Sequence, residues 1–517
     1  LEVEPIEWAE GGVSAPFFSP DGRWVGFSRW GGGPEKILLS GEYPPRTLRD
    51  PSDGRGLAGA AWQEDGSIVF GTVCPPGLYR ISENGGPTEL VVDVDSEDAE
   101  PRVRVRSLTF PEPLPGGDGI LVTKYGDHPQ LGRVLGLVSL SGRETNGAAR
   151  AVPYGRYARS GHVVFPQGTT LSAWALDVET LAFAGHPVDV SEPGMGVDDH
   201  EPHEWAFSQD GTLVYAPMTA AQIPKRSLVL VDRNGGEERL DFPPMPDFDW
   251  VRLSPDGRQV AASAMNRKFY WNVWIHNLES GTRSQVTHAL PLNGHPVWSP
   301  DGSRIVFTST RHGCSGDLYW KQADLGGAAE RLTENQPGYF PVPYSWSPGG
   351  KTLFFWDWGP GTVSGNLWAL DVDPLPPRVR LVHQRQGNMW HPAISPDGLW
   401  MAYVWDGVIF VSPYPAMDRF WQVSPGTGAN PMWHPKGGST LYLDPHGRLM
   451  EAEVRTDPTF STGSPRVVLQ GPYESFDVHP DGERFLAVKV DPGEPITELV
   501  AVENWFEELK RKVPPGG

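Results

Sequence analysis

A short turn signature recurs along almost the whole chain, and this repeat limits the folds that the sequence can adopt. Residues 297–302 give its clearest form, Val-Trp-Ser-Pro-Asp-Gly. Related hexapeptides occupy residues 17–22, 61–66, 114–119, 206–211, 252–257, 345–350, 393–398, 432–437 and 477–482. A weaker copy at residues 159–161 completes the series, so that turn glycines recur every 39 to 53 residues. Self-similarity at this period indicates eleven stacked copies of one supersecondary unit.

Each copy has the chemistry of a tight hairpin between two short strands. Pro presets φ, Asp bonds its own backbone, and Gly accepts the positive φ that closes the turn. An apolar run such as Arg304-Ile-Val-Phe follows, and two further strand-like segments complete the unit. Four antiparallel strands in each repeat are typical of a propeller blade. The sequence therefore predicts an all-β fold, a β-propeller of about eleven four-stranded repeats.

Composition agrees with this fold and excludes some partners. The 61 Gly and 53 Pro residues supply many tight connections, and 21 Trp, 21 Phe and 14 Tyr supply the core that a disordered chain lacks. A formal charge of −21 repels nucleic-acid phosphates, so we expect no nucleic-acid partner. No apolar run is long enough to span a membrane, so we expect no membrane insertion. The first residues lack the features of a signal peptide, which leaves the compartment open.

The repeat resembles a known bacterial family. Trp-Ser-Pro-Asp-Gly followed by an Ile-Val-Phe-type strand is similar to the TolB-type, WD-like propeller repeat. The C-terminal stretch, including residues 447–454, 476–482 and Asn504-Trp-Phe-Glu-Glu-Leu-Lys, resembles the propeller of bacterial eukaryotic-like serine/threonine kinases. That resemblance implies a periplasmic or extracytoplasmic location and a binding role. The chain has no His-Arg-Asp or Asp-Phe-Gly kinase motif and no Gly-x-Ser-x-Gly elbow, so we expect neither a kinase nor a Ser-His-Asp peptidase.

Eleven blades exceed the usual four to eight, so two tandem propellers are predicted. Residues 1–222 would form about five blades and residues 223–517 about six, with a terminal helix at 503–512. One continuous ring over residues 1–517 is the alternative. In either arrangement residues 1–8 would add an outer strand to the last blade. The helix has Trp505, Phe506 and Leu509 on one face, and we expect that face to cover apolar propeller surface.

One position in each blade should face the mouth of the central channel. It lies three residues before the core aromatic of the innermost strand. Ten repeats place there Ala15, Gly59, Phe110, Glu204, Trp250, His295, Pro343, His391, Asn430 and Ser475. Trp205, Trp250, Trp390 and Asn430 are candidate ligand-binding residues, because indole rings stack on ligands and amides bond to them. His434 and His479 replace the turn serine, and we expect them to bond to the turn backbone.

An acidic, histidine-containing loop offers a second kind of site. Residues 198–204 read Asp-Asp-His-Glu-Pro-His-Glu. Carboxylate and neutral imidazole are ligands for Ca²⁺, Mn²⁺ or Zn²⁺. A divalent cation would be held by His200, His203, His295 and His391, with Glu204 and Asp199 as candidate catalytic residues. Pro202 forbids a helix interior here, so this is not the His-Glu-x-x-His motif.

Two functions therefore remain open. The first is a binding propeller that recognises a small molecule, a glycan or a peptide at its channel mouth. The second is a metal-dependent hydrolase that acts on an ester, phosphoester or glycosidic bond. The hydrolase requires His200 or His203 to meet His295 and His391 in one ring, whereas a division near residue 222 would separate them.

Overall fold

The chain forms two compact units, unit 1 (Leu1–Pro224 and Pro492–Gly517) and unit 2 (Lys225–Asp491). They are seen in a computed structural model. It describes residues 13–29, 34–40, 43–48, 57–73, 75–94, 105–126, 133–141, 154–167, 170–191, 205–208, 210–216, 225–240, 247–265, 271–288, 292–312, 315–335, 339–358, 365–373, 375–385, 387–456, 460–491 and 498–514.

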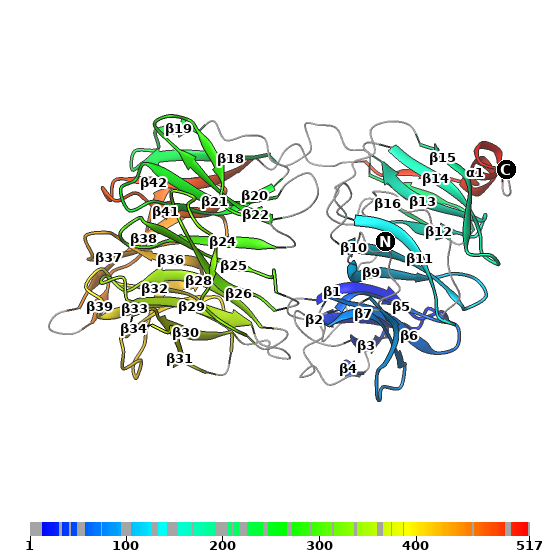
Figure 1. Cartoon of the computed structure of the whole chain (residues 1–517), viewed down its shortest axis with the longest axis horizontal. Helices are drawn as coiled ribbons and strands as arrows, with labels where there is room; N and C mark the ends of the chain where they lie inside the picture. The colour runs from blue at the N-terminus through cyan, green and yellow to red at the C-terminus, as the bar shows by residue number, and fades with distance from the viewer. Residues whose placement is uncertain are drawn as a thin grey trace. The chain divides into compact units, whose positions relative to one another are not determined.

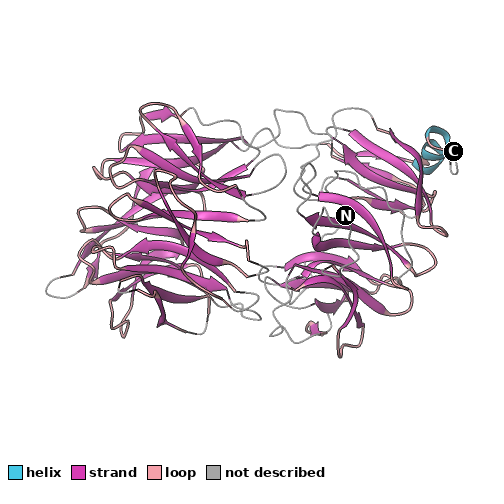
Figure 2. Cartoon of the chain, in the orientation of Figure 1, coloured by secondary structure: helices cyan, strands magenta, loops and turns pink. Residues whose placement is uncertain are grey.

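The described residues form eleven antiparallel sheets, which confirms the predicted all-β fold (Figures 1 and 2). Unit 1 contributes five sheets. Their strands are β1 (Val13–Phe18), β2 (Trp24–Arg29), β3 (Pro34–Leu38) and β4 (Arg46–Thr47); β5 (Leu57–Trp62), β6 (Ser67–Val73), β7 (Pro76–Ser82) and β8 (Glu89–Asp93); β9 (Val105–Pro113), β10 (Gly119–Gly126) and β11 (Arg133–Ser139); β12 (Arg156–Ala158), β13 (His162–Gln167), β14 (Thr170–Asp177) and β15 (Ala182–Asp189); and β16 (Trp205–Phe207), β17 (Leu213–Tyr215) and β43 (Val500–Val502).

Unit 2 contributes six sheets. Their strands are β18 (Lys225–Asp232), β19 (Glu237–Arg239), β41 (Tyr473–Val478) and β42 (Arg484–Asp491); β20 (Asp247–Leu253), β21 (Gln259–Met265), β22 (Trp271–Asn277) and β23 (Arg283–Gln285); β24 (Asn293–Trp298), β25 (Arg304–Ser309), β26 (Asp317–Gln322) and β27 (Glu330–Arg331); β28 (Phe340–Trp346), β29 (Thr352–Trp358), β30 (Asn366–Asp371) and β31 (Arg378–His383); β32 (Met389–Ile394), β33 (Trp400–Trp405), β34 (Val408–Pro413) and β35 (Trp421–Thr427); and β36 (Ala429–Trp433), β37 (Ser439–Leu443), β38 (Leu449–Arg455), β39 (Ser461–Thr462) and β40 (Arg466–Leu469).

The predicted turn chemistry is present between the first two strands of the repeats. Ser299 donates to the Asp301 carboxylate over 2.5 Å, and Gly302 takes a φ of 70°. The hydrogen bond from Ser299 holds the pKa of Asp301 below its ordinary value. His434 and His479 use Nδ1 to accept the backbone N–H two residues on, at 3.2 and 3.3 Å, which confirms their structural role.

One sheet joins the two ends of unit 2. Strands β18 and β19 come from its start and β41 and β42 from its end, in the order β19-β18-β42-β41. Lys225 pairs with Asp491 and Asp232 with Arg484 along the β18–β42 ladder. The innermost strands β20, β24, β28, β32, β36 and β41 are neighbours in that order, and β41 also neighbours β20. Unit 2 is therefore a closed ring of six sheets.

The last sheet of unit 1 is interrupted by the whole of unit 2. Strand β17 ends at Tyr215, and the whole of unit 2 follows it in the sequence. The third strand of this sheet, β43, comes after unit 2, and its Val500 pairs with Tyr215 of β17. Helix α1 (Trp505–Lys512) follows and packs on the same unit. The structure differs here from the predicted domain of residues 223–517, because residues 498–514 belong to unit 1. The expected outer strand at residues 1–8 lies outside the described residues.

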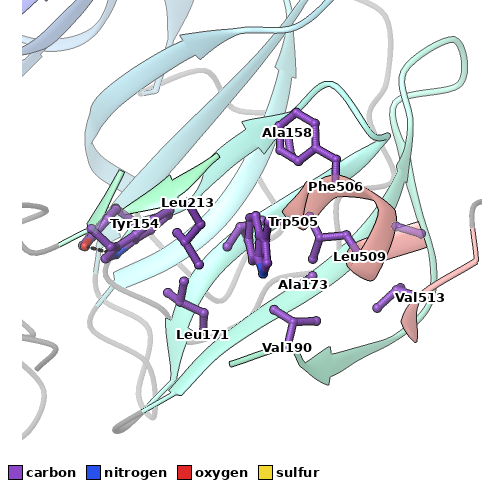
Figure 3. Packing of buried hydrophobic residues seen from close by; sticks show 13 residues of the cluster. Tyr154, Ala158, Leu171, Ala173, Val190, Leu213, Trp505, Phe506, Leu509 and Val513 are labelled. Carbon is purple, nitrogen blue, oxygen red and sulfur yellow. Dashed lines mark hydrogen bonds between the residues drawn. The ribbon is translucent and has the colours of Figure 1, made fainter. Parts of the chain in front are cut away.

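Helix α1 buries the apolar face that the sequence predicts (Figure 3). Trp505, Phe506 and Leu509 pack in one cluster with Leu171, Ala173 and Leu213 from the sheets of unit 1. The backbone N–H of Trp505 donates to Gly211 over 2.9 Å, and His162 Nε2 lies 2.5 Å from the Val513 carbonyl. Among the described residues, no helix is long and apolar enough to cross a membrane.

A buried carboxylate reinforces the ring closure of unit 2. Glu451 on β38 accepts hydrogen bonds from Arg233 over 3.0 and 3.2 Å, from Arg466 over 2.8 Å and from Ser439 over 2.9 Å. Arg233 follows β18, so this bond connects the closing sheet with its neighbour. Burial opposes ionisation of Glu451, but these donors outweigh it and lower the pKa to about 2.

We predict that Leu509→Ala destabilises unit 1 alone. The side chain is fully buried, and loss of such a leucine costs about 2–5 kcal/mol. Calorimetry should show one of two unfolding transitions moving to lower temperature. Leu486→Ala, an equally buried change in unit 2, should move the other transition. A shift of the same transition by both variants would contradict the assignment of α1 to unit 1.

We predict that Glu451→Gln removes about 1.5–3 kcal/mol of stability at neutral pH, because Arg233 and Arg466 lose a buried carboxylate partner and Arg233 keeps only its ion pair with Glu483 at 3.4 Å. The folded pKa of about 2 lies below the unfolded value near 4.5, so the wild-type contribution is present above pH 4.5. It is lost as the pH falls toward 2. Urea unfolding at several pH values should show this acid-dependent difference between the two proteins.

The matched control is Glu474→Gln, which removes a more exposed ion pair with Arg226. Exposed pairs contribute up to about 1 kcal/mol, so this variant should remain close to the wild type. Equal losses in the two variants would show that the Glu451 network has no special part in closing the ring.

Candidate functional site

The predicted mouth position is a bulge with an unusual backbone. Where the innermost strand pairs with the next strand, the register shifts at this position in sheet after sheet. At six of these positions the residue takes a positive φ, namely Gly59 (93°), Phe110 (49°), Trp250 (55°), His295 (56°), His391 (55°) and Asn430 (53°). The sequence alignment of the repeats therefore identified a real structural equivalence.

This conformation favours glycine, and Gly59 shows that the fold accepts one. Non-glycine residues in this region cost of order 1–2 kcal/mol relative to ordinary backbone, asparagine less. Unit 2 nevertheless places an indole and two imidazoles there. The bulge itself belongs to the repeat, because Phe110 of unit 1 has it too. The particular side chains at the bulges of unit 2 are what distinguish this ring.

These side chains meet at the centre of unit 2. The ring of Trp250 lies 4.9 Å from that of His295 and 5.6 Å from that of His391. His391 is on β32, three strands around the ring from β20, so the indole reaches across the centre. Tyr344 lies 5.9 Å from Trp250 and stacks on His391 at 5.1 Å. Four rings from four sheets thus form one aromatic cluster, which we call the central cluster.

Both histidines of the central cluster are neutral. Burial, with a smaller contribution from the Arg252 charge, lowers the pKa of His295 to about 4 and of His391 to about 3. His391 Nδ1 accepts the backbone N–H of Asn430 over 3.3 Å. Nδ1 of His295 is buried without a hydrogen-bond partner. The cluster therefore offers uncharged donors and acceptors beside flat aromatic surfaces.

Sequence reasoning missed two members of this site, Arg252 and Tyr344. Arg252 is 6 % exposed, and its guanidinium lies 5.4 Å from the Trp250 ring and 5.0 Å from the Tyr344 ring. A charged residue within the apolar run Trp250-Val-Arg-Leu was the available signal. A comparison of the bulge positions alone does not reveal it.

The other predicted site residues have different surroundings. Trp390 lies 6.4 Å from His391 and packs on the apolar clusters of its blade. Trp205 belongs to unit 1, where it stacks on Tyr154 and donates to its hydroxyl over 2.7 Å. Packing therefore accounts for its burial. Asp199, His200, His203 and Glu204 lie outside the described residues.

The metal hypothesis depends on that acidic loop. Within the described ranges, no three His, Cys, Asp or Glu side chains are grouped so that they could hold a metal ion. His295 and His391 belong to unit 2, whereas residues 198–204 belong to unit 1. A cation held by all of these residues stays a prediction.

The closed ring of six repeated sheets defines unit 2 as a β-propeller. Residues 251–364 match the family described as the TolB beta propeller domain, so this part of the chain is similar to that family. The predicted TolB-type repeat is thereby confirmed. The link to kinases stays a prediction.

Similar proteins come from several bacteria. An uncharacterized protein of Agrobacterium fabrum is 29% identical over 236 residues, which cover 43% of this chain and 76% of that protein. The Tol-Pal system protein TolB of Alcanivorax borkumensis is 38% identical over 60 residues, 12% of this chain and 14% of that protein. A solved TolB from Acinetobacter baumannii is 15% identical with a TM-score of 0.37, covering 66% of this chain and 81% of that one.

We predict that the ring protons of His295 and His391 do not titrate between about pH 5 and pH 8, although a free histidine titrates near 6.5. Their folded pKa values of about 4 and 3 lie below this range. Carbon-proton NMR spectra over this pH range, with signals assigned by His295→Gly and His391→Gly, measure this directly. Titration of either signal near pH 6.5 would show that the rings are solvated.

Proposed function

We propose that unit 2 is a binding module whose recognition site is the mouth of its ring, at the central cluster. One observation carries the proposal. Trp250, His295, His391 and Asn430 come from four sheets, hold strained backbone and converge, with Trp250, His295 and His391 in ring contact and Asn430 hydrogen-bonded to His391. Strained residues that persist in a structure tend to gather at ligand sites.

The chemistry of the cluster favours a peptide over a cation as ligand. Neutral imidazoles and an amide make directional hydrogen bonds without charge, and indole and phenol rings provide flat apolar contact area. Such surfaces suit the alternating polar and apolar groups of an extended peptide. A role in binding partners agrees with the TolB-type family of residues 251–364. An extracytoplasmic location remains part of the proposal and rests on the same family resemblance.

Glycine substitutions provide a test that preserves the backbone. Because glycine accepts a φ near 55° at no steric cost, His391→Gly and Trp250→Gly remove the rings but keep the bulge. Peptides selected from a random library displayed on phage should bind the wild-type chain. We expect each variant to weaken their binding at least about tenfold, a loss of about 1.4 kcal/mol.

Phe110→Gly is the matched control, since it makes the same change at the equivalent bulge of unit 1. Its peptide binding should equal that of the wild type. If no peptide is enriched, or if the unit 2 variants bind the selected peptides as well as Phe110→Gly does, the central cluster is not the recognition site.

A further inference from the structure

The strongest unexplained feature of unit 2 is the arginine at its centre. Arg252 is on β20, yet its guanidinium contacts Tyr344 of β28 and acts electrostatically on His295 of β24, His391 of β32 and Asp477 of β41. These residues come from five of the six innermost strands. The charge therefore lies near the axis of the ring, where the blades converge.

This charge is incompletely matched by the protein. The residue is 6 % exposed, one terminal nitrogen donates to the Val251 carbonyl over 3.0 Å, and Nε is buried without a hydrogen-bond partner. Arginine keeps its positive charge in proteins, and a buried charge is costly unless it is paired. This arrangement is typical of a binding site in which a ligand supplies the negatively charged partner of the arginine.

Asp477, an acidic residue that interacts electrostatically with Arg252, does not fill this role. The carboxylate oxygens of Asp477 accept the backbone N–H groups of Leu253 over 2.7 Å and Val478 over 2.8 Å. Among the described residues, no ion pair joins Asp477 to Arg252 within 4.0 Å. Burial raises the pKa of Asp477, and the charge of Arg252 only partly opposes this rise. Asp477 is thus a weak counter-ion for Arg252, because its carboxylate already accepts two backbone hydrogen bonds.

The surroundings of Arg252 select the shape of the missing anion. The guanidinium carbon lies over the rings of Trp250 and Tyr344, 5.4 and 5.0 Å from their centres, so these rings occupy part of the space around it. One Nη is already used by a carbonyl, whereas Nε retains its donor capacity. The edge that contains Nε is one of the two that bind a planar carboxylate through parallel hydrogen bonds.

We propose that the centre of unit 2 recognises a carboxylate, carried by the C-terminus or by an acidic side chain of a bound peptide, through the Nε edge of Arg252. This inference rests on the proposed function and specifies the chemical group that the site binds. Trp250, His295, Tyr344 and His391 then shield the ion pair from water. In such surroundings a charge-assisted hydrogen bond is stronger than in solvent.

Matched acid and amide probes test this inference on the full chain by ligand-observed NMR and calorimetric titration. N-acetylphenylalanine and its amide test a C-terminal carboxylate. N-acetylaspartate amide and N-acetylasparagine amide test a side-chain carboxylate. We expect one acid to bind at least about tenfold more tightly than its amide, which is about 1.4 kcal/mol.

Two variants connect that preference to Arg252. Arg252→Gln should abolish the difference between acid and amide, and Arg252→Lys should retain only part of it, because lysine keeps the charge but lacks the planar fork. Retention of both calorimetric transitions confirms that a variant is folded. If Arg252→Gln does not fold, the comparison of acid with amide on the wild-type chain still decides the matter.

Equal binding of acid and amide, or no binding of any probe, overturns the carboxylate inference. An acid preference that Arg252→Gln leaves intact also overturns it. The peptide selection separates this failure from that of the proposed function. If selected peptides still depend on His391 while the probes show no acid preference, the binding site stands and only its ligand class is wrong.

Discussion

The ladder between β18 and β42 is the interaction on which the rest of unit 2 depends. It joins the first and last strands of the unit and places β41 beside β20. Without it the six sheets would be an open row with two exposed edges. Trp250 of β20 contacts His391 of β32, and Arg252 acts on Asp477 of β41, because the row is bent into a ring. The central cluster is therefore a product of closure as much as of its own residues.

The bulges show how a structural device is used for recognition. Several innermost strands turn their backbone near the axis through a bulge, and a residue with positive φ makes this turn. Unit 1 has Gly59 and Phe110 at two such bulges, and unit 2 has Trp250, His295, His391 and Asn430. The fold thus supplies positions that aim side chains inward, and the residue types at those positions determine what the ring can bind.

The sequence predicted the parts of the fold that depend on local chemistry. The hydrogen bonds of a Ser-Pro-Asp-Gly turn join residues within the turn, so residues 297–302 alone are sufficient to predict a hairpin. The apolar face of α1 is likewise predictable from residues 505–509 alone. Strand partners distant in sequence were not predictable. Neither β18 nor β43 shows in its own residues that it pairs with β42 or β17, because antiparallel strands accept many partners.

The candidate site was predictable to a similar extent. Repeat alignment found His295, His391, Trp250 and Asn430, because the bulge occupies one fixed place in each unit. It did not find Arg252, because this residue contacts Tyr344 on another sheet, and the spacing of residues within one repeat does not predict contacts between sheets. Trp205 follows Glu204, the mouth position of its repeat, and it packs on Tyr154 in unit 1.

The interruption of the last sheet of unit 1 has a consequence for synthesis of the chain. On the ribosome, β16 and β17 emerge early, but β43 and α1 emerge only after all of unit 2 has been made. At about 5–20 residues per second, the wait is on the order of tens of seconds. During that interval β17 lacks its outer neighbour, and the apolar surface that Trp505, Phe506 and Leu509 later cover is exposed. Unit 2, whose two ends pair with each other, can close first, so the unit that begins the chain is the last to be finished.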